Sequence, residues 1–252
     1  MSDFNIHTVR SFDGNIIPIS REIKLLGVVL DSTLSFDSYT SEIIKSVNLT
    51  LRNIKLIRKF LSKDAVQTLI HSLVTSKLDA CNSLFIGLSK KNLCKLQVIQ
   101  NSALRCVMNI PPHSHVSQHY LDLHWLHVEK RIYFKFITTV FKCINNIAPA
   151  QLSYKLNLNC AFQMILDTSS FVPASDLGRK SFSYMAPRCW NALPFELRVI
   201  TALEPFKCRL KTYLFKNFRI YLRNVDPYTS ITLLQGDQAA DDNFLINYLF
   251  NY

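Results

Sequence analysis

Apolar residues recur every three or four positions along most of this chain, the spacing that places them on one face of an α-helix. Residues 38–60 combine this period with lysine and arginine on the opposite side, so an amphipathic helix is predicted there. A second helix is predicted to start at Ser62, a candidate N-cap that can accept a first-turn N–H, and a third is predicted to start near Ser89. The inward face of the second helix is expected to carry Val66, Leu69, Ile70, Leu73 and Val74.

The helical pattern continues to about residue 220. The third helix is expected to stop at Pro111-Pro112, because proline cannot continue the backbone hydrogen-bond ladder. Long helices are predicted near 128–146 and over 203–220. A shorter one surrounds Trp190, whose indole is expected to anchor the last part of the chain on the 128–146 helix. Residues 157–182 lack a clear period and are predicted to be an irregular connector.

The start of the chain has a different pattern. Residues 4–31 alternate apolar and polar side chains around the turn dipeptide Asp13-Gly14, so they are predicted to form a hairpin and one more strand. The expected fold class is therefore mainly α, with short strands at the N-terminus.

Composition supports a folded protein. Of 252 residues, 48% are hydrophobic and only 5 are glycine, which is enough apolar material for a core and little for phosphate-binding glycine loops. Neither a run of 18 apolar residues nor a secretory signal pattern occurs, so we expect an intracellular protein, nuclear or cytoplasmic, without a membrane partner. Seven widely spaced cysteines without a C-x-x-C pair favour reduced core thiols over disulfides or zinc.

Positive charge is concentrated in two parts of the chain. The formal net charge is +11; residues 40–135 contribute 14 Lys plus Arg against 5 acids, and residues 179–223 contribute 10 against 2. Residues 225–252 carry four Asp and no Lys or Arg. Two basic helical blocks indicate a polyanionic partner.

Two motifs invite a metal interpretation. Five histidines lie between residues 113 and 127, but His119 and His124 are five positions apart rather than four and no cysteine is near, so surface histidines are the preferred interpretation. Ala239-Ala240-Asp241-Asp242 mimics a polymerase metal turn. It stands in a polar tail, whereas two-metal catalysis needs carboxylates from separate strands, so no catalytic or metal-binding residue is predicted.

Aromatic side chains in the second half allow two interpretations. They can stack on unpaired bases, but their aliphatic neighbours at helical spacing favour a core. The residues concerned are Trp125, Tyr133, Phe134, Phe136, Trp190 and Phe195.

Six strings, in this order and spacing, resemble the C-terminal part of jockey-like LINE reverse transcriptases, the RNA-directed DNA polymerases of non-LTR retrotransposons. The resemblance covers roughly residues 25–218. The strings are LLGVVLDSTLSFDSYTSEI (25–43), LVTSKLDACNSLFIGLSKKNLCKLQVIQNSALR (73–105), LHWLHVEKRIYFKF (123–136), NNIAPAQL (145–152), SFSYMAPRCWNALPFELR (181–198) and FKCRLKTYLF (206–215).

The resemblance implies four regions: a strand-rich remnant of the polymerase palm at 1–36, a helical thumb-like region at 37–112, a C-terminal helical domain at 113–223 and an acidic tail at 224–252. In the family, the metal-binding aspartates precede the string matched by LGVVLD, and this chain begins about 25 residues before it. We therefore expect a truncated chain that lacks the catalytic carboxylates. No cofactor is expected, because Mg²⁺ belongs to the intact parent polymerase.

The expected function is non-sequence-specific binding of RNA, DNA or RNA–DNA hybrid, because phosphate contact needs cations along a surface rather than a base code. Two alternatives stay open. The cations can simply solvate helix exteriors, and the chain can be a non-functional relic or a protein-interaction fragment whose exposed palm remnant another protein covers. Candidate nucleic-acid-binding residues are Arg52, Lys55, Arg58, Lys59, Lys90, Lys91, Lys95, Arg105, Lys207, Arg209, Lys211 and Lys216.

Overall fold

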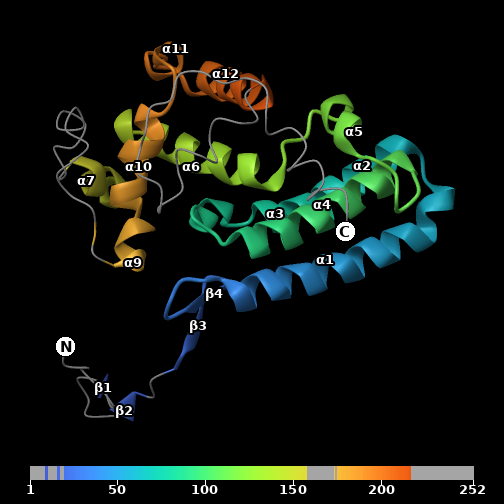
Figure 1. Ribbon diagram of the computed structural model, residues 1–252, viewed down its shortest axis with the longest axis horizontal. Coiled ribbons are helices and arrows are strands. Elements are labelled where there is room, and N and C mark those ends of the chain that lie inside the picture. Colours follow the sequence, from blue (N-terminus) through green and yellow to red (C-terminus); the bar gives the residue numbers. More distant parts are fainter. Residues whose placement is uncertain (1–8, 11–15, 18–19, 158–172, 174, 217–252) are drawn as a thin grey trace, which may run out of the picture.

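The structure is a computed structural model that describes residues 9–10, 16–17, 20–157, 173 and 175–216 (Figure 1). It confirms the predicted fold class, which is mainly α with short strands at the start. The helical elements, with short 3-10 or π turns labelled η, are α1 (Asp37–Ile57), η1 (Arg58–Phe60), α2 (Lys63–Ile70), η2 (His71–Thr75), α3 (Ser76–Asp79), η3 (Asn82–Phe85), α4 (Lys90–Met108), α5 (Ser117–Asp122), α6 (Val128–Ile144), α7 (Ala150–Asn157), α9 (Asp176–Arg179), α10 (Phe182–Asn191), α11 (Phe195–Arg198) and α12 (Leu203–Lys216).

The described strands form two antiparallel hairpins. β1 (Val9–Arg10) pairs with β2 (Ile16–Ile17), and β3 (Glu22–Leu25) pairs with β4 (Val28–Asp31). Leu26 and Gly27 close the second hairpin with φ angles of 49° and 85°, as a two-residue type I′ turn requires. The single strand predicted after the first hairpin is therefore a second hairpin.

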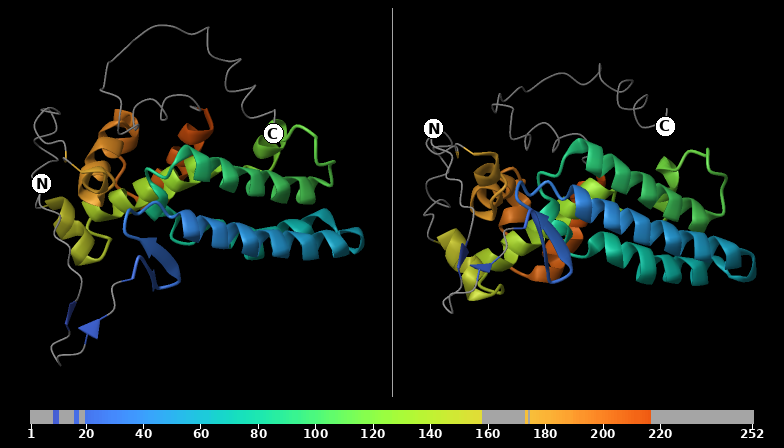
Figure 2. Two further views of the ribbon diagram at one scale, coloured as in Figure 1. Left: turned by 60° about the horizontal axis from the view of Figure 1, so that its bottom comes forward. Right: turned by 90° about the horizontal axis from the view of Figure 1, so that it is seen from below.

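Helices α1 and α4 run parallel and side by side (Figure 2). At their N-terminal ends, Asn92 Nδ2 donates a hydrogen bond to Asp37 Oδ1 at 2.5 Å. At their C-terminal ends, Arg58 Nε donates to the carbonyl oxygen of Cys106 at 2.9 Å. The segment α2–η2–α3 carries the chain back between the two, which makes a parallel arrangement possible.

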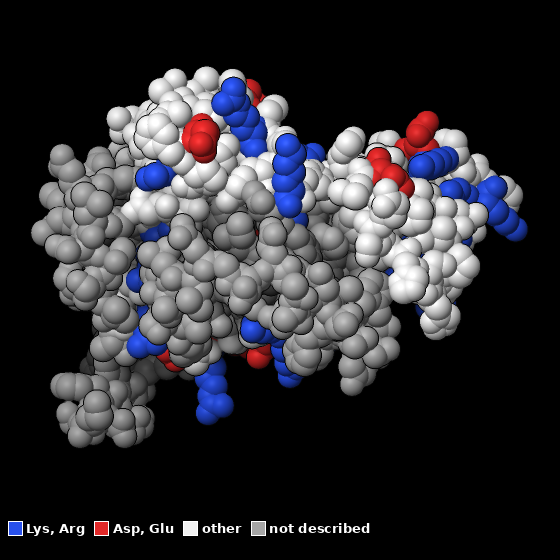
Figure 3. All heavy atoms as spheres, turned by 45° about the horizontal axis from the view of Figure 1, so that its top comes forward, with Lys and Arg blue, Asp and Glu red and all other residues white. Residues whose placement is uncertain are grey.

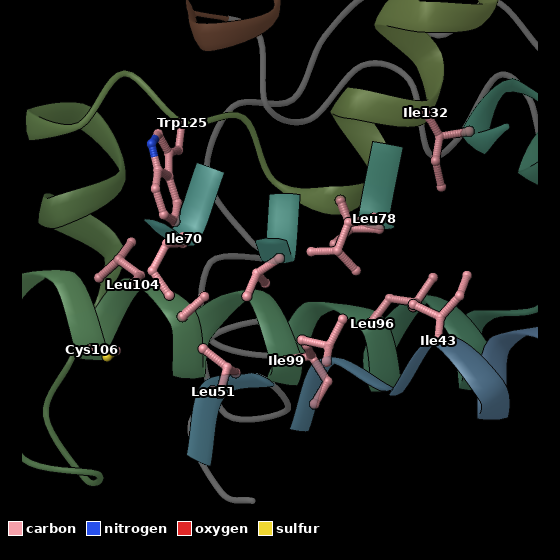
Figure 4. Close-up of a cluster of buried hydrophobic side chains, with 14 of the residues drawn as sticks. Ile43, Leu51, Ile70, Leu78, Leu96, Ile99, Leu104, Cys106, Trp125 and Ile132 are labelled. Atoms are coloured by element: carbon pink, nitrogen blue, oxygen red, sulfur yellow. The ribbon is translucent and has the colours of Figure 1, made fainter. Parts of the chain in front are cut away.

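This bundle encloses the first hydrophobic cluster. In Figure 4, side chains from α1, α2, α3 and α4 point toward one another, and Trp125, which follows α5, covers one end. The predicted cap is confirmed, because Ser62 accepts a hydrogen bond from the N–H of Ala65. The structure adds a second cap at Ser89, near which the third helix is predicted to start, since Ser89 accepts a hydrogen bond from the N–H of Asn92. These caps fix where α2 and α4 begin.

Helix α6 belongs to two hydrophobic clusters. Its first turns place Val128 and Ile132 in the cluster of the bundle, and its later turns pack against α10 and α12 in a second cluster. The predicted anchor is confirmed, since Trp190 is buried with its ring 6.3 Å from Phe141 and 5.8 Å from Phe206. One helix thus ties both halves together.

Several predicted inward positions are exposed. Leu73 is 43% exposed, because the wider π turn η2 rotates the side chains that follow Ile70 relative to an α-helix. Val74 is buried on the inner face instead. Phe195, expected in the core, is 68% exposed, and Phe134 is half-buried, whereas the other four aromatics are buried. Among the six described cysteines, all of them free, three are exposed: Cys81, Cys94 and Cys208.

The predicted connector at 157–182 is only partly irregular. The helical turn α9 lies within it, and Ser175 starts this turn by accepting a hydrogen bond from the N–H of Gly178. Residues 158–172 and 174 lie outside the described part of the chain, as do residues 217–220 of the helix predicted for 203–220.

Asp31 organises the junction between β4 and α1. Its carboxylate accepts hydrogen bonds from the hydroxyl of Thr33 and from the N–H groups of Ser35 and Phe36, the last two at 2.9 and 2.8 Å. Burial raises the pKa of Asp31, but these hydrogen bonds outweigh it and hold the pKa well below its usual value. The charged carboxylate therefore stabilises the folded junction.

Arg58 joins the C-terminal ends of α1 and α4. Besides the bond to Cys106, its guanidinium donates to the carbonyl oxygens of Val107 at 3.2 Å and of Leu61 at 3.1 Å. The last carbonyls of a helix have no partner within the helix and carry partial negative charge. One cation thus satisfies two carbonyls at the end of α4 and ties them to the chain just after η1.

We expect Arg58→Ala to lower the free energy of unfolding by about 2–3 kcal/mol, because three carbonyl oxygens are deprived of a charged donor. Arg58→Lys should recover only part of the lost stability, since one ammonium group cannot reach all three carbonyl oxygens. Urea denaturation followed by circular dichroism measures the effect. Lys55→Ala, an exposed neighbour, is the control and changes stability by less than about 0.5 kcal/mol. Equal stability of Arg58→Ala and the native chain would contradict this role.

We expect Asp31→Ala to cost about 1–2 kcal/mol of stability at pH 7. A carboxylate whose pKa is lowered by folding stabilises the protein above its unfolded pKa, and this contribution is lost as the pH falls toward the folded pKa. The difference from the native chain should therefore shrink below about pH 4. Urea denaturation between pH 7 and pH 2 tests it, with the exposed neighbour Ser32→Ala as control. If the stability difference between Asp31→Ala and the native chain stays constant with pH, the charged form of Asp31 does not stabilise the junction.

Candidate nucleic-acid interface

An open groove runs between the C-terminal halves of α1 and α4. It consists of two adjoining hollows, the larger about 640 Å³, that share Lys55, Leu56 and Ser102 in their walls. Leu56, Ile110 and Pro112 supply apolar surface. The cations that line the groove are Arg52, Lys55, Arg58, Lys59 and Arg105.

The two walls contain no acidic residue. Neither residues 43–63, which form most of α1 and its end, nor residues 80–121, which include all of α4, contain an aspartate or a glutamate. Cys106 also lines the groove, and burial raises the pKa of its thiol. The positive charges of Lys55 and Arg58 act in the opposite direction, so both cations lie near this thiol. The positive potential of the groove is therefore not neutralised from within its walls.

Two of the predicted binding residues serve the fold instead. Arg58 directs its donors to the backbone carbonyls at the ends of α1 and α4. Arg105 donates from Nε and one terminal nitrogen to the carbonyl oxygen of Ser114, at 3.3 and 3.2 Å, and so holds the loop after α4. Their positive charge remains in the groove, but three of the five N–H donors of Arg58 and two of the five of Arg105 are engaged within the protein.

Three other predicted residues are available to a ligand. Arg52, Lys55 and Lys59 are exposed along one side of α1 and η1. Among the described residues, Arg52 and Lys55 have no hydrogen-bond or ion-pair partner. Arg52 and Lys55 can therefore reach a phosphate without breaking a hydrogen bond or an ion pair, and Lys59 gives up at most its contact with the ring of Phe60.

The N-terminal half of α4 lengthens the basic surface in part. Lys91 and Lys95 are exposed and, at spacings of four and seven residues, lie on the same helix face as the groove residue Ser102. Lys90 lies near Glu129 at the start of α6. Burial raises the pKa of the Glu129 carboxyl, and the positive charge of Lys90 partly offsets this rise. The structure therefore brings Lys91 and Lys95 into line with the groove, and places Lys90 closer to α6.

The second predicted cluster, on α12, is divided. Lys207 and Lys211 are four residues apart and share one face, whereas Arg209 and Lys216 are seven apart and share another. Lys207 also forms an ion pair with Glu204 at 2.6 Å. On the face shown in Figure 3, cations and carboxylates lie together over α12 and again over the bundle end near α2 and α5. This surface has mixed charge, unlike the groove.

The histidines do not converge on one point. His119 contacts Asp122, while His127 stacks on Tyr120 with ring centroids 4.1 Å apart. Burial, helped by Lys130, lowers the pKa of His127 to about 4, so its ring is neutral. Within the described ranges, no three His, Cys, Asp or Glu side chains form a group that could hold a metal ion.

Phe60 is a feature of the groove region that sequence reasoning missed. It ends η1, is 76% exposed, and its ring centroid lies 4.9 Å from Nζ of the groove residue Lys59. The sequence did contain a signal for it. Val47, Leu51 and Ile54 recur at the spacing of the buried helix face, and Phe60 does not continue that spacing, so its side chain is expected to point to solvent.

No helix in the described part of the chain is long and apolar enough to cross a membrane. The segment Ala239–Asp242 lies outside that part. Comparison of the chain with protein-family models, with curated proteins and with solved structures found no match. Within the residues that the structure describes, the groove between α1 and α4, whose walls contain no carboxylate, is the candidate site that we pursue.

Proposed function

We propose that this chain binds the phosphate backbone of nucleic acid without sequence specificity, through the groove between α1 and α4, and that an RNA–DNA hybrid is its ligand. The observation that carries the proposal is the set of exposed cations Arg52, Lys55 and Lys59 beside a groove whose walls contain no acidic residue. Backbone binding requires mobile cations along a surface, and it releases counterions from the nucleic acid.

The choice of a hybrid rests on the resemblance to jockey-like LINE reverse transcriptases, in which the matching part would be the thumb. The motif strings that carry this resemblance supply part of each helix that walls the groove, since they cover residues 25–43 and 73–105. A helical bundle that follows a short antiparallel hairpin is compatible with a thumb joined to the last palm strands. We propose no polymerase activity for the chain, because its sequence offers no set of carboxylates for a two-metal site.

A protein-binding role is the second candidate, and the β3–β4 hairpin favours it. The apolar residues Ile23, Leu25 and Leu26 are 62%, 55% and 95% exposed. Strand β3 pairs only with β4 among the described strands, so its other edge is open to a partner. This role predicts no dependence on the groove cations.

We expect a fluorescently labelled 20-base-pair RNA–DNA hybrid to bind the full chain at low salt and to weaken steeply as salt rises. Three phosphate contacts predict a decrease of roughly 40-fold in affinity between 50 and 200 mM salt. The triple variant Arg52→Ala/Lys55→Ala/Lys59→Ala should bind far more weakly. Its slope of log affinity against log salt should be shallower by roughly 0.9 for each phosphate that is no longer neutralised. Fluorescence anisotropy measures both quantities.

The matched control is Lys24→Ala/Lys135→Ala/Arg198→Ala, which removes the same charge from exposed cations outside the groove. It should change the salt slope little. If both triple variants weaken binding equally, net charge rather than the groove is responsible. Absence of binding by the native chain at low salt would eliminate the proposed function and favour the protein-binding role.

A further inference from the structure

The aromatic ring of Phe60 lies beside the groove residue Lys59 with most of its surface in water. It is 76% exposed, and the preceding residue, Lys59, lines the groove and holds its ammonium 4.9 Å from the ring centroid. Leu56, one turn earlier in α1, is 69% exposed and also lines the groove. An exposed aromatic ring and an exposed leucine therefore adjoin the groove cation Lys59.

Single exposed apolar side chains are ordinary on protein surfaces, so the position of Phe60 beside groove cations, rather than its exposure, suggests a binding role. Two other aromatic residues of the described chain, Phe195 and Tyr154, are 68% and 61% exposed, but neither adjoins a groove residue in the sequence as Phe60 adjoins Lys59. Phe60 differs because a polyanion held by Lys55 and Lys59 would pass directly beside its ring. Aromatic rings next to a cationic groove are the means by which proteins hold unpaired bases.

We infer that Phe60 stacks on an unpaired nucleobase of the nucleic acid whose backbone lies in the groove. This inference rests on the proposed function and adds to it a preference for nucleic acid that carries an unpaired base. Bases inside a duplex already stack on their neighbours and cannot reach the ring without being unstacked. The ligand that satisfies both the groove and Phe60 is therefore a duplex with a single-stranded overhang.

The test compares two hybrids that share one duplex, one with blunt ends and one with a three-nucleotide overhang that begins with 2-aminopurine. The native chain should bind the overhang hybrid about five- to a hundred-fold more tightly, which is the effect expected of one stacked base. The fluorescence of 2-aminopurine should fall on binding, because stacking on an aromatic ring quenches it. Phe60→Ala should abolish both the preference and the quenching while still binding the blunt hybrid.

Two variants separate stacking from general effects. Phe60→Tyr keeps an aromatic face and should retain the preference, whereas Phe195→Ala removes a similarly exposed ring on α11 and should change nothing. Because Phe60 is exposed, its substitution should leave the thermal unfolding of the chain unaltered.

The outcomes distinguish this inference from the proposed function. Equal binding of the blunt and overhang hybrids by the native chain overturns the role of Phe60 and leaves the groove intact. An overhang preference that survives in Phe60→Ala also overturns it, because another residue then holds the base. Failure of the native chain to bind either hybrid at low salt overturns both proposals together.

Discussion

The Arg58 guanidinium is the interaction on which the rest of the candidate site depends. Parallel helices bring equal ends of their dipoles together, so the C-terminal ends of α1 and α4 both present carbonyl oxygens with partial negative charge. Arg58 lies between these ends and donates to Leu61 on one side and to Cys106 and Val107 on the other. Arg58 thereby stabilises the parallel pairing that the returning segment α2–η2–α3 allows, and that pairing aligns the cations of α1 with the face of α4.

A second constraint is that one helix serves two cores. Polar contacts hold α6 at the bundle: Arg131 donates to both carboxylate oxygens of Asp79 from α3, and the N–H of Val128 donates to Gln97 Oε1 of α4 at 3.0 Å. The desolvation cost of a partly buried ion pair offsets much of its gain in stability, so this pair mainly fixes the position of α6 relative to α3. Since Trp125 also belongs to the bundle cluster, the first core extends beyond the predicted boundary at 112–113. The domain boundaries themselves stay predictions.

The fold was largely predictable because periodicity and caps are local signals. Ser62 and Ser89 begin their helices as their side chains suggest, and Leu73 fails only because a π turn changes the phase. The site was less predictable. The division of the α12 cations follows from helical spacing alone, but the engagement of Arg58 with Cys106 joins residues 48 positions apart. Sequence identifies a cation, whereas only the packed helices show whether its donors are already occupied.

The number of free cations decides what kind of binding this surface can support. Five cations line the groove, but backbone carbonyls already hold the guanidinium groups of Arg58 and Arg105 in place, which leaves three cations whose side chains can move to a phosphate. Non-specific complexes that rely on such contacts have dissociation constants of about 10⁻⁴–10⁻⁶ M at physiological salt. Three contacts place this groove at the weak end of that range. The surface is therefore suited to guide a strand that other contacts also hold, as one wall of a larger binding channel would, rather than to capture nucleic acid alone.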